Sequence, residues 1–309
     1  MASSHQYSFL LVSLILILSS LVVPSTAIAT ARKLSLVQQQ PLVLSYHNGP
    51  LLKGNITVHI TWYGKFTPSQ RAILIDFIQS LRVLIPAPSV SSWWKMTEEY
   101  KRGFTNLIVG KQTIDETYSL GKSLKYPHIL RFARRGDHQG AISVIFTAKD
   151  VLVDGFCMNN CGSHGTGKAS RTSKTKFPYI WVGNPETQCP GECAWPFYQP
   201  IYGPQTPPLI APNGDIGVDG MIINFATLLA GTVTNPFDNG YYQGPSNAPL
   251  EAVSACTGIY GKGAYPGYPG ELLVDKTTGA SYNAVGIHGR KYLLPAMWDP
   301  KTSACSTLV

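Results

Sequence analysis

A strict alternation of apolar and polar residues marks the first clear element of the chain. From Ile56 to Tyr63 the apolar positions fall on every second residue. Side chains two residues apart share one face of an extended strand, so this pattern predicts a half-buried β-strand. His59 falls on the polar face, and we interpret it as a structural or exposed histidine, not as a ligand.

A helix is predicted to follow this strand. Thr67 can cap it, Pro68 suits its first position, and Gln70 completes a capping box. Apolar residues then recur at helical spacing as far as Ile85, and Pro86 ends the pattern.

A second helix is predicted from Ser92 to Lys101. It carries the adjacent pair Trp93 and Trp94. Exposed tryptophans can stack on sugar rings, so both are candidates for sugar stacking. Adjacent residues on a helix point in different directions, however, and at least one of the two is expected in the core.

Three short apolar runs, residues 107–109, 142–146 and 179–182, are typical of central strands that are buried on both faces. Residues 198–216 are predicted to form a long irregular loop, and a further helix is predicted from Gly217 to Gly231. Strands interleaved with helices favour a mixed α+β (α/β) fold: one three-layer domain with a mainly central mixed sheet and a loop-rich second half stapled by disulfides.

The beginning of the chain predicts a secretory signal peptide over residues 1–29. An apolar run from Phe9 to Val23 precedes small residues, with cleavage expected after Ala29 or Ala31. The run is shorter than the roughly 20 apolar residues of a membrane span, so none is expected after cleavage. The mature chain, residues 30–309, is expected to form a single domain.

Cysteines are expected to pair, because the secretory route is oxidising. The six cysteines are Cys157, Cys161, Cys189, Cys193, Cys256 and Cys305. The simplest connectivity is one local bridge within each C-x3-C unit and a third bridge from Cys256 to Cys305 that holds the C-terminus. Crossed pairing between the two C-x3-C units stays open.

Asn55 is the predicted site of N-linked glycosylation. The sequence Asn55-Ile56-Thr57 has the acceptor pattern, with an allowed middle residue.

The formal net charge of +8 predicts attraction to polyanions. Two clusters carry the positive charge: Arg131, Arg134 and Arg135, then Lys168, Arg171, Lys174 and Lys176. They are candidates for binding an acidic wall polysaccharide, and ordinary solvated loops are the alternative. Nucleic acid is not expected as a partner, since the chain carries no nucleic-acid-binding motif.

Two partial motifs surround His164. Residues Gly162 to Lys168 have the glycine and lysine spacing of a phosphate-binding loop, but Ala169 replaces the hydroxyl that would bind magnesium. His164 and the four clustered cysteines could in principle close a tetrahedral zinc site, but the C-x3-C spacing is loose and disulfides compete for the sulfurs. We therefore expect neither metal nor cofactor.

No catalytic motif is intact. The chain contains neither H-E-x-x-H nor G-x-S-x-G. A carboxylate pair assembled in space is left open, and its candidates are Glu192, Asp215, Asp219 and Glu251. No catalytic residue is predicted.

Four segments carry a family resemblance: Ser89-Val-Ser-Ser-Trp-Trp-Lys95, Phe156 to Gly165, Gln188 to Phe197, and Val218 through Phe237. In these the chain resembles the EXORDIUM family, also called phosphate-induced protein 1. The resemblance implies a secreted plant protein of the apoplast and cell wall that promotes cell expansion and links growth to brassinosteroid and carbon status. It implies no enzymatic activity.

A fainter likeness concerns Thr227 to Pro236, which is similar to the helix of certain secreted bacterial zinc proteases. Thr227 and Leu228 would occupy the places of the metal-binding His and the catalytic Glu. The hypothesis is a zincin-like fold that has lost its metal site, with a vacant cleft beside the predicted helix.

The expected function is therefore growth promotion by binding a wall polymer or an unidentified receptor. The alternative is an extracellular hydrolase that acts on wall material, either a degenerate metalloprotease or a glycosidase.

Overall fold

The computed structural model describes residues 41–100, 103–170, 173, 175–246 and 248–309. The predicted signal peptide, Lys101, Arg171 and Lys174 lie outside the described residues. Residues Leu42–Val309 form one compact unit.

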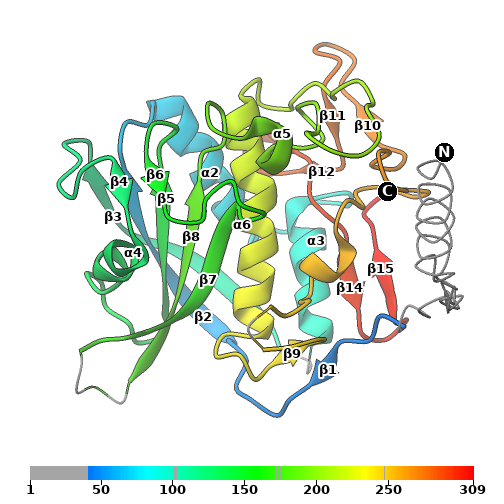
Figure 1. The fold of residues 1–309 in the computed structure, drawn as a ribbon. Coiled ribbons are helices and arrows are strands. Elements are labelled where there is room, and N and C mark those ends of the chain that lie inside the picture. Colours follow the sequence, from blue (N-terminus) through cyan, green and yellow to red (C-terminus); the bar gives the residue numbers. More distant parts are fainter. Residues whose placement is uncertain (1–40, 101–102, 171–172, 174, 247) are drawn as a thin grey trace, which may run out of the picture. The chain divides into compact units, whose positions relative to one another are not determined.

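A five-stranded mixed sheet forms the centre of this unit (Figure 1). Its strands lie in the order β3 (Thr105–Asp115), β2 (Gly54–Tyr63), β5 (Ala141–Thr147), β8 (Lys176–Gly183) and β7 (Gly162–Lys168). The first four are mutually parallel, whereas β7 runs antiparallel to β8 at one edge. The predicted mixed α+β fold with a central mixed sheet is confirmed.

Helices cover both faces of the sheet (Figure 1). Helix α4 packs against β5, while on the other face α2 packs against β3, and α6 packs against β7 and β8. The helices are α2 (Pro68–Ser80), α3 (Val90–Lys95), α4 (Tyr126–Ala133), α5 (Pro190–Cys193) and α6 (Ile216–Thr234), with 3-10 helices η1 (Met96–Glu99), η2 (Ser254–Cys256) and η3 (Ile287–Gly289).

Short two-stranded ladders complete the fold, most of them in the second half of the chain. They pair β1 (Ser45–Tyr46) with β9 (Tyr241–Tyr242), β4 (Ser123–Leu124) with β6 (Leu152–Val153), β10 (Leu273–Val274) with β11 (Ser281–Tyr282), β12 (Ala284–Val285) with β13 (Lys291–Tyr292), and β14 (Met297–Asp299) with β15 (Ala304–Ser306).

Aromatic rings join the layers. Phe146 of β5 packs against Trp62 of β2 and against Phe225 of α6, with ring centroids 5.1 Å apart in each pair. On the opposite face, Tyr63 packs against Phe132 of α4. Successive residues of a strand point to opposite faces, and Trp62 and Tyr63 are both fully buried. The end of β2 is therefore buried on both faces, more deeply than the half-buried strand predicted.

Helix α2 begins as predicted and ends early. Thr67 Oγ1 accepts a hydrogen bond from Gln70 N, and Gln70 Oε1 accepts one from Thr67 N, which closes the capping box. The helix ends at Ser80, so the predicted end at Ile85 was wrong. Leu81 is still buried, but Val83 and Leu84 are 40% and 93% exposed, so the chain after Leu81 does not continue a buried helix face.

The second predicted helix is shorter than expected and starts earlier. Ser89 caps α3 through a hydrogen bond from Ser92 N to Ser89 Oγ of 3.1 Å. The chain then tightens into η1, which ends at Glu99.

One of the three apolar runs was wrongly predicted to be a central strand. Residues 107–109 lie in β3 at the edge of the sheet, where Ile108 is 37% exposed. Residues 142–146 and 179–182 do lie in the interior strands β5 and β8, and they are buried.

Helix α6 extends the prediction by one residue at its start and by three at its end. Asp215 caps it, accepting a hydrogen bond from Val218 N at 2.9 Å. Among the described residues it is the one helix that is long and apolar enough to cross a membrane. Of its most apolar window, 78% is buried inside the fold, which is typical of the core helix of a globular protein.

Candidate functional site

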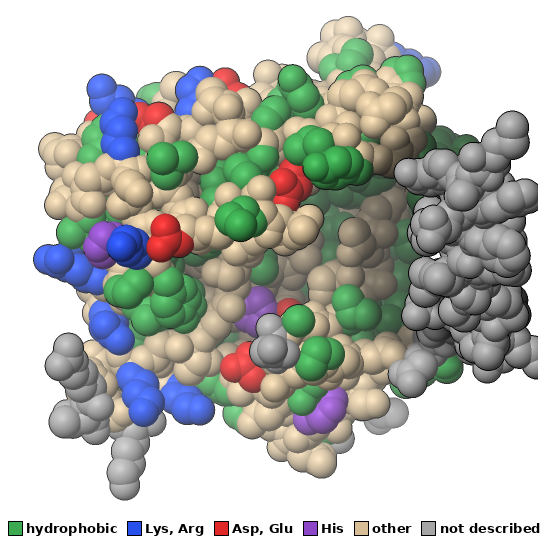
Figure 2. Space-filling model, viewed as in Figure 1, with side chains coloured by type: hydrophobic (Ala, Val, Ile, Leu, Met, Phe, Trp, Pro, Cys, Tyr) green, Lys and Arg blue, Asp and Glu red, His purple; other side chains and the backbone are tan. Residues whose placement is uncertain are grey.

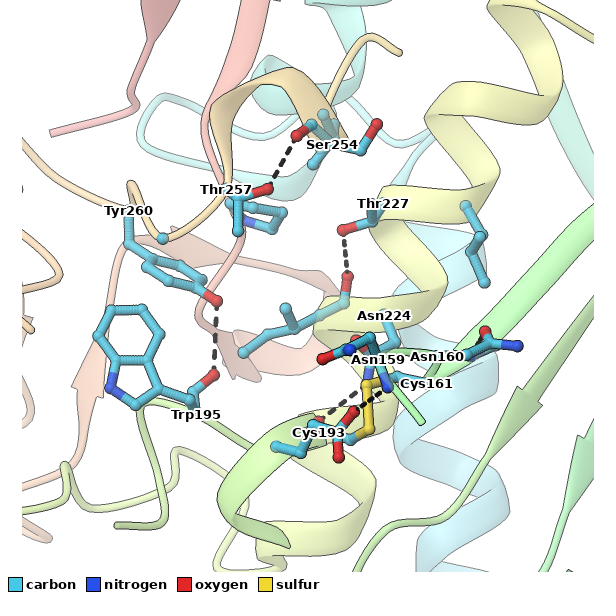
Figure 3. Close-up of a pocket in the computed structure, with 17 residues that line it drawn as sticks. Asn159, Asn160, Cys161, Cys193, Trp195, Asn224, Thr227, Ser254, Thr257 and Tyr260 are labelled. Carbon is cyan, nitrogen blue, oxygen red and sulfur yellow. Dashed lines mark hydrogen bonds between the residues drawn. A yellow bond between two sulfur atoms is a disulfide. The ribbon is translucent and has the colours of Figure 1, made fainter. Parts of the chain in front are cut away.

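A cleft of about 390 Å³ opens beside α6, where the zincin-like hypothesis expects one. Ile223, Asn224, Thr227 and Leu228 of α6 form one wall. Residues 159–162, the end of α5 and residues 253–260 form the others (Figure 3). The space-filling view shows this face hollowed beside α6 (Figure 2).

Amide and hydroxyl groups dominate the polar lining of the cleft. They belong to Asn159, Asn160, Asn224, Thr227, Ser254 and Thr257. Asn224 Nδ2 donates to the carbonyl of Cys193 at 2.9 Å, which fixes the orientation of its amide. Such groups can both donate and accept hydrogen bonds, as the hydroxyls of a saccharide require.

Two aromatic residues line one side of the cleft, opposite Asn160 (Figure 3). The ring centroids of Trp195 and Tyr260 are 5.6 Å apart, with the rings tilted by 52°. Tyr260 is 4% exposed, and burial raises the pKa of its hydroxyl. Trp195 is partly exposed and offers apolar surface to a ligand.

Two crossed disulfides fix the wall that adjoins α6 at Asn224. The bridges are Cys157–Cys189 and Cys161–Cys193, and each spans 32 residues. The simplest prediction, a local bridge within each C-x3-C unit, was wrong, and the crossed pairing that stayed open is the one observed. The crossed bridges fasten residues 157–161 to α5, so two segments that line the cleft cannot separate.

The third bridge was predicted correctly. Cys256–Cys305 spans 49 residues and ties the end of the chain to η2, beside the cleft. No cysteine is free among the described residues.

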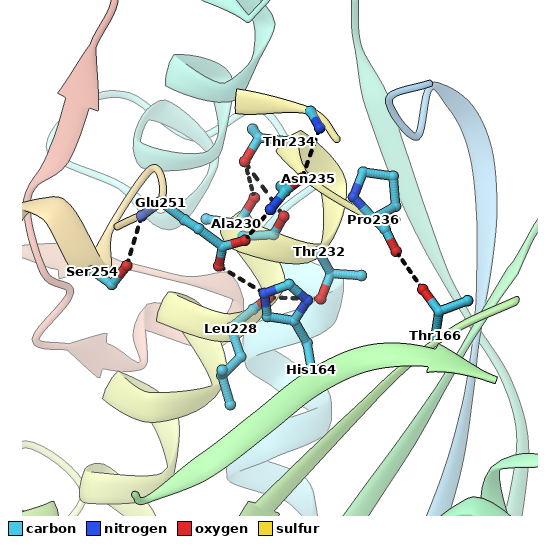
Figure 4. Close-up of polar contacts among 12 residues, drawn as sticks. His164, Thr166, Leu228, Ala230, Thr232, Thr234, Asn235, Pro236, Glu251 and Ser254 are labelled. Carbon is cyan, nitrogen blue, oxygen red and sulfur yellow. Dashed lines mark hydrogen bonds and ion pairs between the residues drawn. The ribbon is translucent and has the colours of Figure 1, made fainter. Parts of the chain in front are cut away.

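A buried hydrogen-bond network lies behind the cleft wall (Figure 4). His164 of β7 meets Glu251 with 2.7 Å between Nε2 and Oε2, and Asn235 Nδ2 donates to Glu251 Oε1 at 2.7 Å. The side chains of His164 and Glu251 are 10% and 9% exposed. Gly231 of α6 lies against both, and a Cβ there would clash with Glu251 Oε2. The absence of a side chain at Gly231 therefore leaves the space that this pair occupies.

His164 is held toward its charged form. Burial alone would lower its pKa, but the hydrogen bond and negative charge of Glu251, helped by Asp238, raise the pKa above its ordinary value of 6.5. Its second nitrogen, Nδ1, is buried and has no hydrogen-bond partner among the described residues. The network is contiguous with the cleft, because Glu251 N donates to Ser254 Oγ at 2.8 Å and Ser254 lines the cleft.

The four candidate carboxylates have separate surroundings. Glu192 lines the cleft, whereas Glu251 bonds His164. Asp215 caps α6, and Asp219 accepts hydrogen bonds from Asn213. Burial raises the pKa of Asp219 to about 7. Among the described residues, the cleft lining therefore contains one carboxylate, not a pair.

The cleft hydroxyls are engaged with the main chain. Thr227 Oγ1 donates to the carbonyl of Ile223 at 2.9 Å, and Thr257 Oγ1 donates to that of Ser254 at 2.8 Å. A nucleophilic hydroxyl needs a base within hydrogen-bond reach, and neither donates to one. Thr227 and Leu228, at the places of the protease His and Glu, offer neither a metal-binding group nor a general base. The arrangement is suited to hold a ligand.

The predicted sugar-stacking role of Trp93 and Trp94 was wrong. They are 1% and 4% exposed. Trp93 Nε1 donates to the carbonyl of Pro295 and Trp94 Nε1 to that of Thr105, each at 2.7 Å. Both tryptophans belong to the core.

The two basic clusters adjoin in space. Arg134 Nε at the end of α4 donates to the carbonyl of Lys168 at the end of β7, at 3.0 Å. Arg131, Arg135 and Lys176 are also exposed. Figure 2 shows Lys and Arg side chains gathered on the side of the molecule that holds α4 and the β7–β8 hairpin. The name basic face is used below for Arg131, Arg134, Arg135, Lys168 and Lys176.

Other sequence candidates have simple structural settings. Asn55 is exposed in β2 and its Oδ1 accepts from Asn106 Nδ2 at 2.9 Å, so its glycosylation stays a prediction. His59 Nδ1 accepts a hydrogen bond from Lys111 N at 3.1 Å, a structural role as interpreted.

The apparent phosphate-binding loop from Gly162 to Lys168 is the extended strand β7, which cannot wrap around a phosphate. The cysteines of the discounted zinc site are all in disulfides.

Sequence reasoning missed most of the cleft. Asn159 and Asn160 lie inside the first C-x3-C unit, so the cysteine spacing was a usable signal for them. Asn224 lay within a predicted helix but without a motif. Nothing in the sequence links Tyr260 to Trp195.

Comparisons with known proteins agree over nearly the whole chain. A family model described as phosphate-induced protein 1 conserved region matches residues 44–308. Protein EXORDIUM-like 2 of Arabidopsis thaliana is 64% identical over 89% of this chain and 92% of its own. Protein PHOSPHATE-INDUCED 1 of Nicotiana tabacum is 61% identical over 90% of this chain and 93% of its own. Protein EXORDIUM of Arabidopsis thaliana is 59% identical over 89% of this chain and 93% of its own. No solved structure matches.

Proposed function

The chain belongs to the phosphate-induced protein 1 family, which includes EXORDIUM, and we propose that it is a secreted plant cell-wall protein that promotes cell expansion by binding a wall polysaccharide. Membership in this family indicates a plant growth-related protein. The three disulfides of the chain, together with the family, suggest that it is secreted. Wall location, cell expansion and a link to brassinosteroid and carbon status are parts of the proposal.

The chemistry of the cleft beside α6 carries the proposal. Three amides, three hydroxyls and two aromatic residues line a pocket of about 390 Å³. Saccharides combine hydroxyl edges with apolar C–H faces, and binding sites that match them pair polar groups with aromatic rings. The crossed disulfides hold these groups in place, which lowers the entropy lost on binding.

Binding without catalysis is supported by what the cleft side chains do. Hydrolysis of a glycosidic bond by the usual mechanism needs two carboxylates that flank the bond. Glu192 is the one carboxylate that the described part of the chain contributes to the lining. His164, which lies behind the cleft wall, is buried and directed at Glu251. The hydrolase remains the alternative that an activity measurement would reveal.

The basic face supplies a second contact, with acidic wall polysaccharide. Its described cations are exposed and lie on α4 and the β7–β8 hairpin, outside the cleft. Attraction between exposed charges is screened by salt. This contact should hold the protein in the wall at low ionic strength, while the cleft selects the ligand.

Blocking the cleft tests the proposal. Thr257 is exposed and lines the cleft, so Thr257→Tyr should fill part of it while leaving the fold intact. Thr302→Tyr is the matched control, because Thr302 is also exposed and lies outside the cleft. We expect native affinity electrophoresis in gels with soluble wall polysaccharides to show retardation of the unmodified protein and of Thr302→Tyr. Equal retardation of Thr257→Tyr would contradict the proposal.

A further inference from the structure

We infer that the cleft beside α6 is one half of a longer site that binds an extended, uncharged polysaccharide chain. This inference rests on the saccharide binding proposed above, and it adds the charge and length of the ligand. A second groove, of about 340 Å³, adjoins the cleft at Trp195, which lines both.

The second groove has the composition of a sugar-binding surface. Two segments form it, residues 195–209 and 267–274, together with Ser281. Tyr198 and Tyr268 contribute rings, and Thr206 and Ser281 contribute hydroxyls. Tyr198 is 45% exposed, so much of its surface is available to a ligand.

The walls of the groove are tied to each other. Thr206 Oγ1 donates to the carbonyl of Gly267 at 2.9 Å, and Leu209 N donates to that of Pro196 at 2.9 Å. Gly267 has a φ of 88° and packs closely against Pro204, a position where a side chain would clash. The groove is therefore formed before any ligand arrives, which favours binding of a stiff polymer.

Trp195 connects the two halves. Its ring packs against Tyr260 in the cleft, and its neighbour Pro196 belongs to the groove. Tyr260 is buried and lies against the second hydrophobic cluster, which fixes the position of Trp195. A chain that fills the cleft can thus continue over Trp195 into the groove.

The charge of the residues that line the two hollows indicates which class of polysaccharide fits them. Of the residues that the structure describes, Glu192 is the one charged residue that lines the cleft, and no charged one lines the groove. An acidic polysaccharide would place carboxylates near Glu192 with no cation in the lining to offset them. The cations of the basic face lie outside both linings. The joined site therefore fits a neutral glycan.

Calorimetric titration with neutral gluco-oligosaccharides, from disaccharide to hexasaccharide, tests the inference on the full secreted protein. We expect the hexasaccharide to bind about tenfold more tightly than the disaccharide, because ring contacts in the groove add to those in the cleft. Tyr198→Ala should lower the affinity for the hexasaccharide roughly two- to tenfold and leave the affinity for the disaccharide unchanged. Phe104→Ala is the control, since Phe104 is 61% exposed and lines neither hollow.

The outcomes separate the inference from the proposed function. If both oligosaccharides bind equally and Tyr198→Ala changes neither, the extended site is refuted while saccharide binding in the cleft stands. If an oligogalacturonide binds more tightly and Thr257→Tyr blocks it, the neutral class is refuted. Binding of no oligosaccharide of any length would overturn both.

Discussion

Removing Glu251 should destabilise the protein strongly, because Glu251 is the shared partner in the buried network behind the cleft. Glu251→Ala would leave His164 Nε2 and Asn235 Nδ2 without their partner, in a site where the His164 side chain is 10% exposed. Breaking a buried ion pair by removing one partner costs about 3 to 5 kcal/mol of unfolding free energy. Glu186→Ala is the control, since Glu186 pairs with Lys149 at the surface and such pairs contribute about 0 to 1 kcal/mol.

Glu251→Gln separates the charge of Glu251 from its hydrogen bonds. Glutamine can still accept from Asn235 and donate to a neutral His164, so we expect a loss of about 1 to 2 kcal/mol, the charge-assisted part of the interaction. The variant should also change the pH dependence. Glu251 raises the pKa of folded His164 above its unfolded value near 6.5. The stabilisation by the pair is therefore fully present below about pH 6.5, and it is lost as pH rises through the folded-state pKa.

Urea denaturation at about pH 5 and about pH 8, followed by tryptophan fluorescence, measures both effects. The unmodified protein should lose more stability between the two values than Glu251→Gln does. The reasoning is refuted if Glu251→Ala is no more harmful than Glu186→Ala, or if Glu251→Gln keeps the full pH dependence of the unmodified protein.

Three further predictions concern the surface and the disulfides. Asn55→Gln should increase the electrophoretic mobility of the protein secreted from plant cells as much as glycosidase treatment does, and unchanged mobility would mean that Asn55 carries no glycan. Mass spectrometry of unreduced peptides should find Cys157 joined to Cys189. Changing both to Ser should lower stability by about 2 to 3 kcal/mol, because the retained Cys161–Cys193 bridge still joins the two segments and the unfolded chain gains only a short loop's freedom. A local bridge from Cys157 to Cys161 would contradict the crossed pairing. Arg134→Ser should weaken binding to acidic polysaccharide at low salt and not at high salt, whereas a loss that is independent of salt would argue against the basic face.

Local sequence signals predicted the elements that depend on neighbouring residues. The alternation from Ile56 to Tyr63 lies within β2, and Thr67 with Gln70 caps α2 as expected. The apolar spacing from Gly217 to Gly231 lies within α6. In each case the deciding interactions join residues within a few positions of each other, so the sequence contains them directly.

The remaining features depend on contacts between distant segments. The burial of Trp93, for example, involves Pro295, 202 residues away, whose carbonyl accepts a hydrogen bond from the indole N–H. The crossed disulfides follow from the packing of residues 157–161 on α5, which cysteine spacing leaves open. His164 and Glu251 are 87 residues apart, and no periodic pattern joins them. The cleft was expected beside α6, but its composition could not be predicted, because most of its lining comes from other parts of the chain.

The most direct test of the central claim measures binding and turnover together. The secreted protein is incubated with a soluble neutral wall polysaccharide, and both the bound fraction and the number of new reducing ends are followed over time. The account predicts saturable binding that Thr257→Tyr removes, with no increase in reducing ends. A steady release of reducing ends that Thr257→Tyr abolishes would show that the cleft is a catalytic site and would contradict the account.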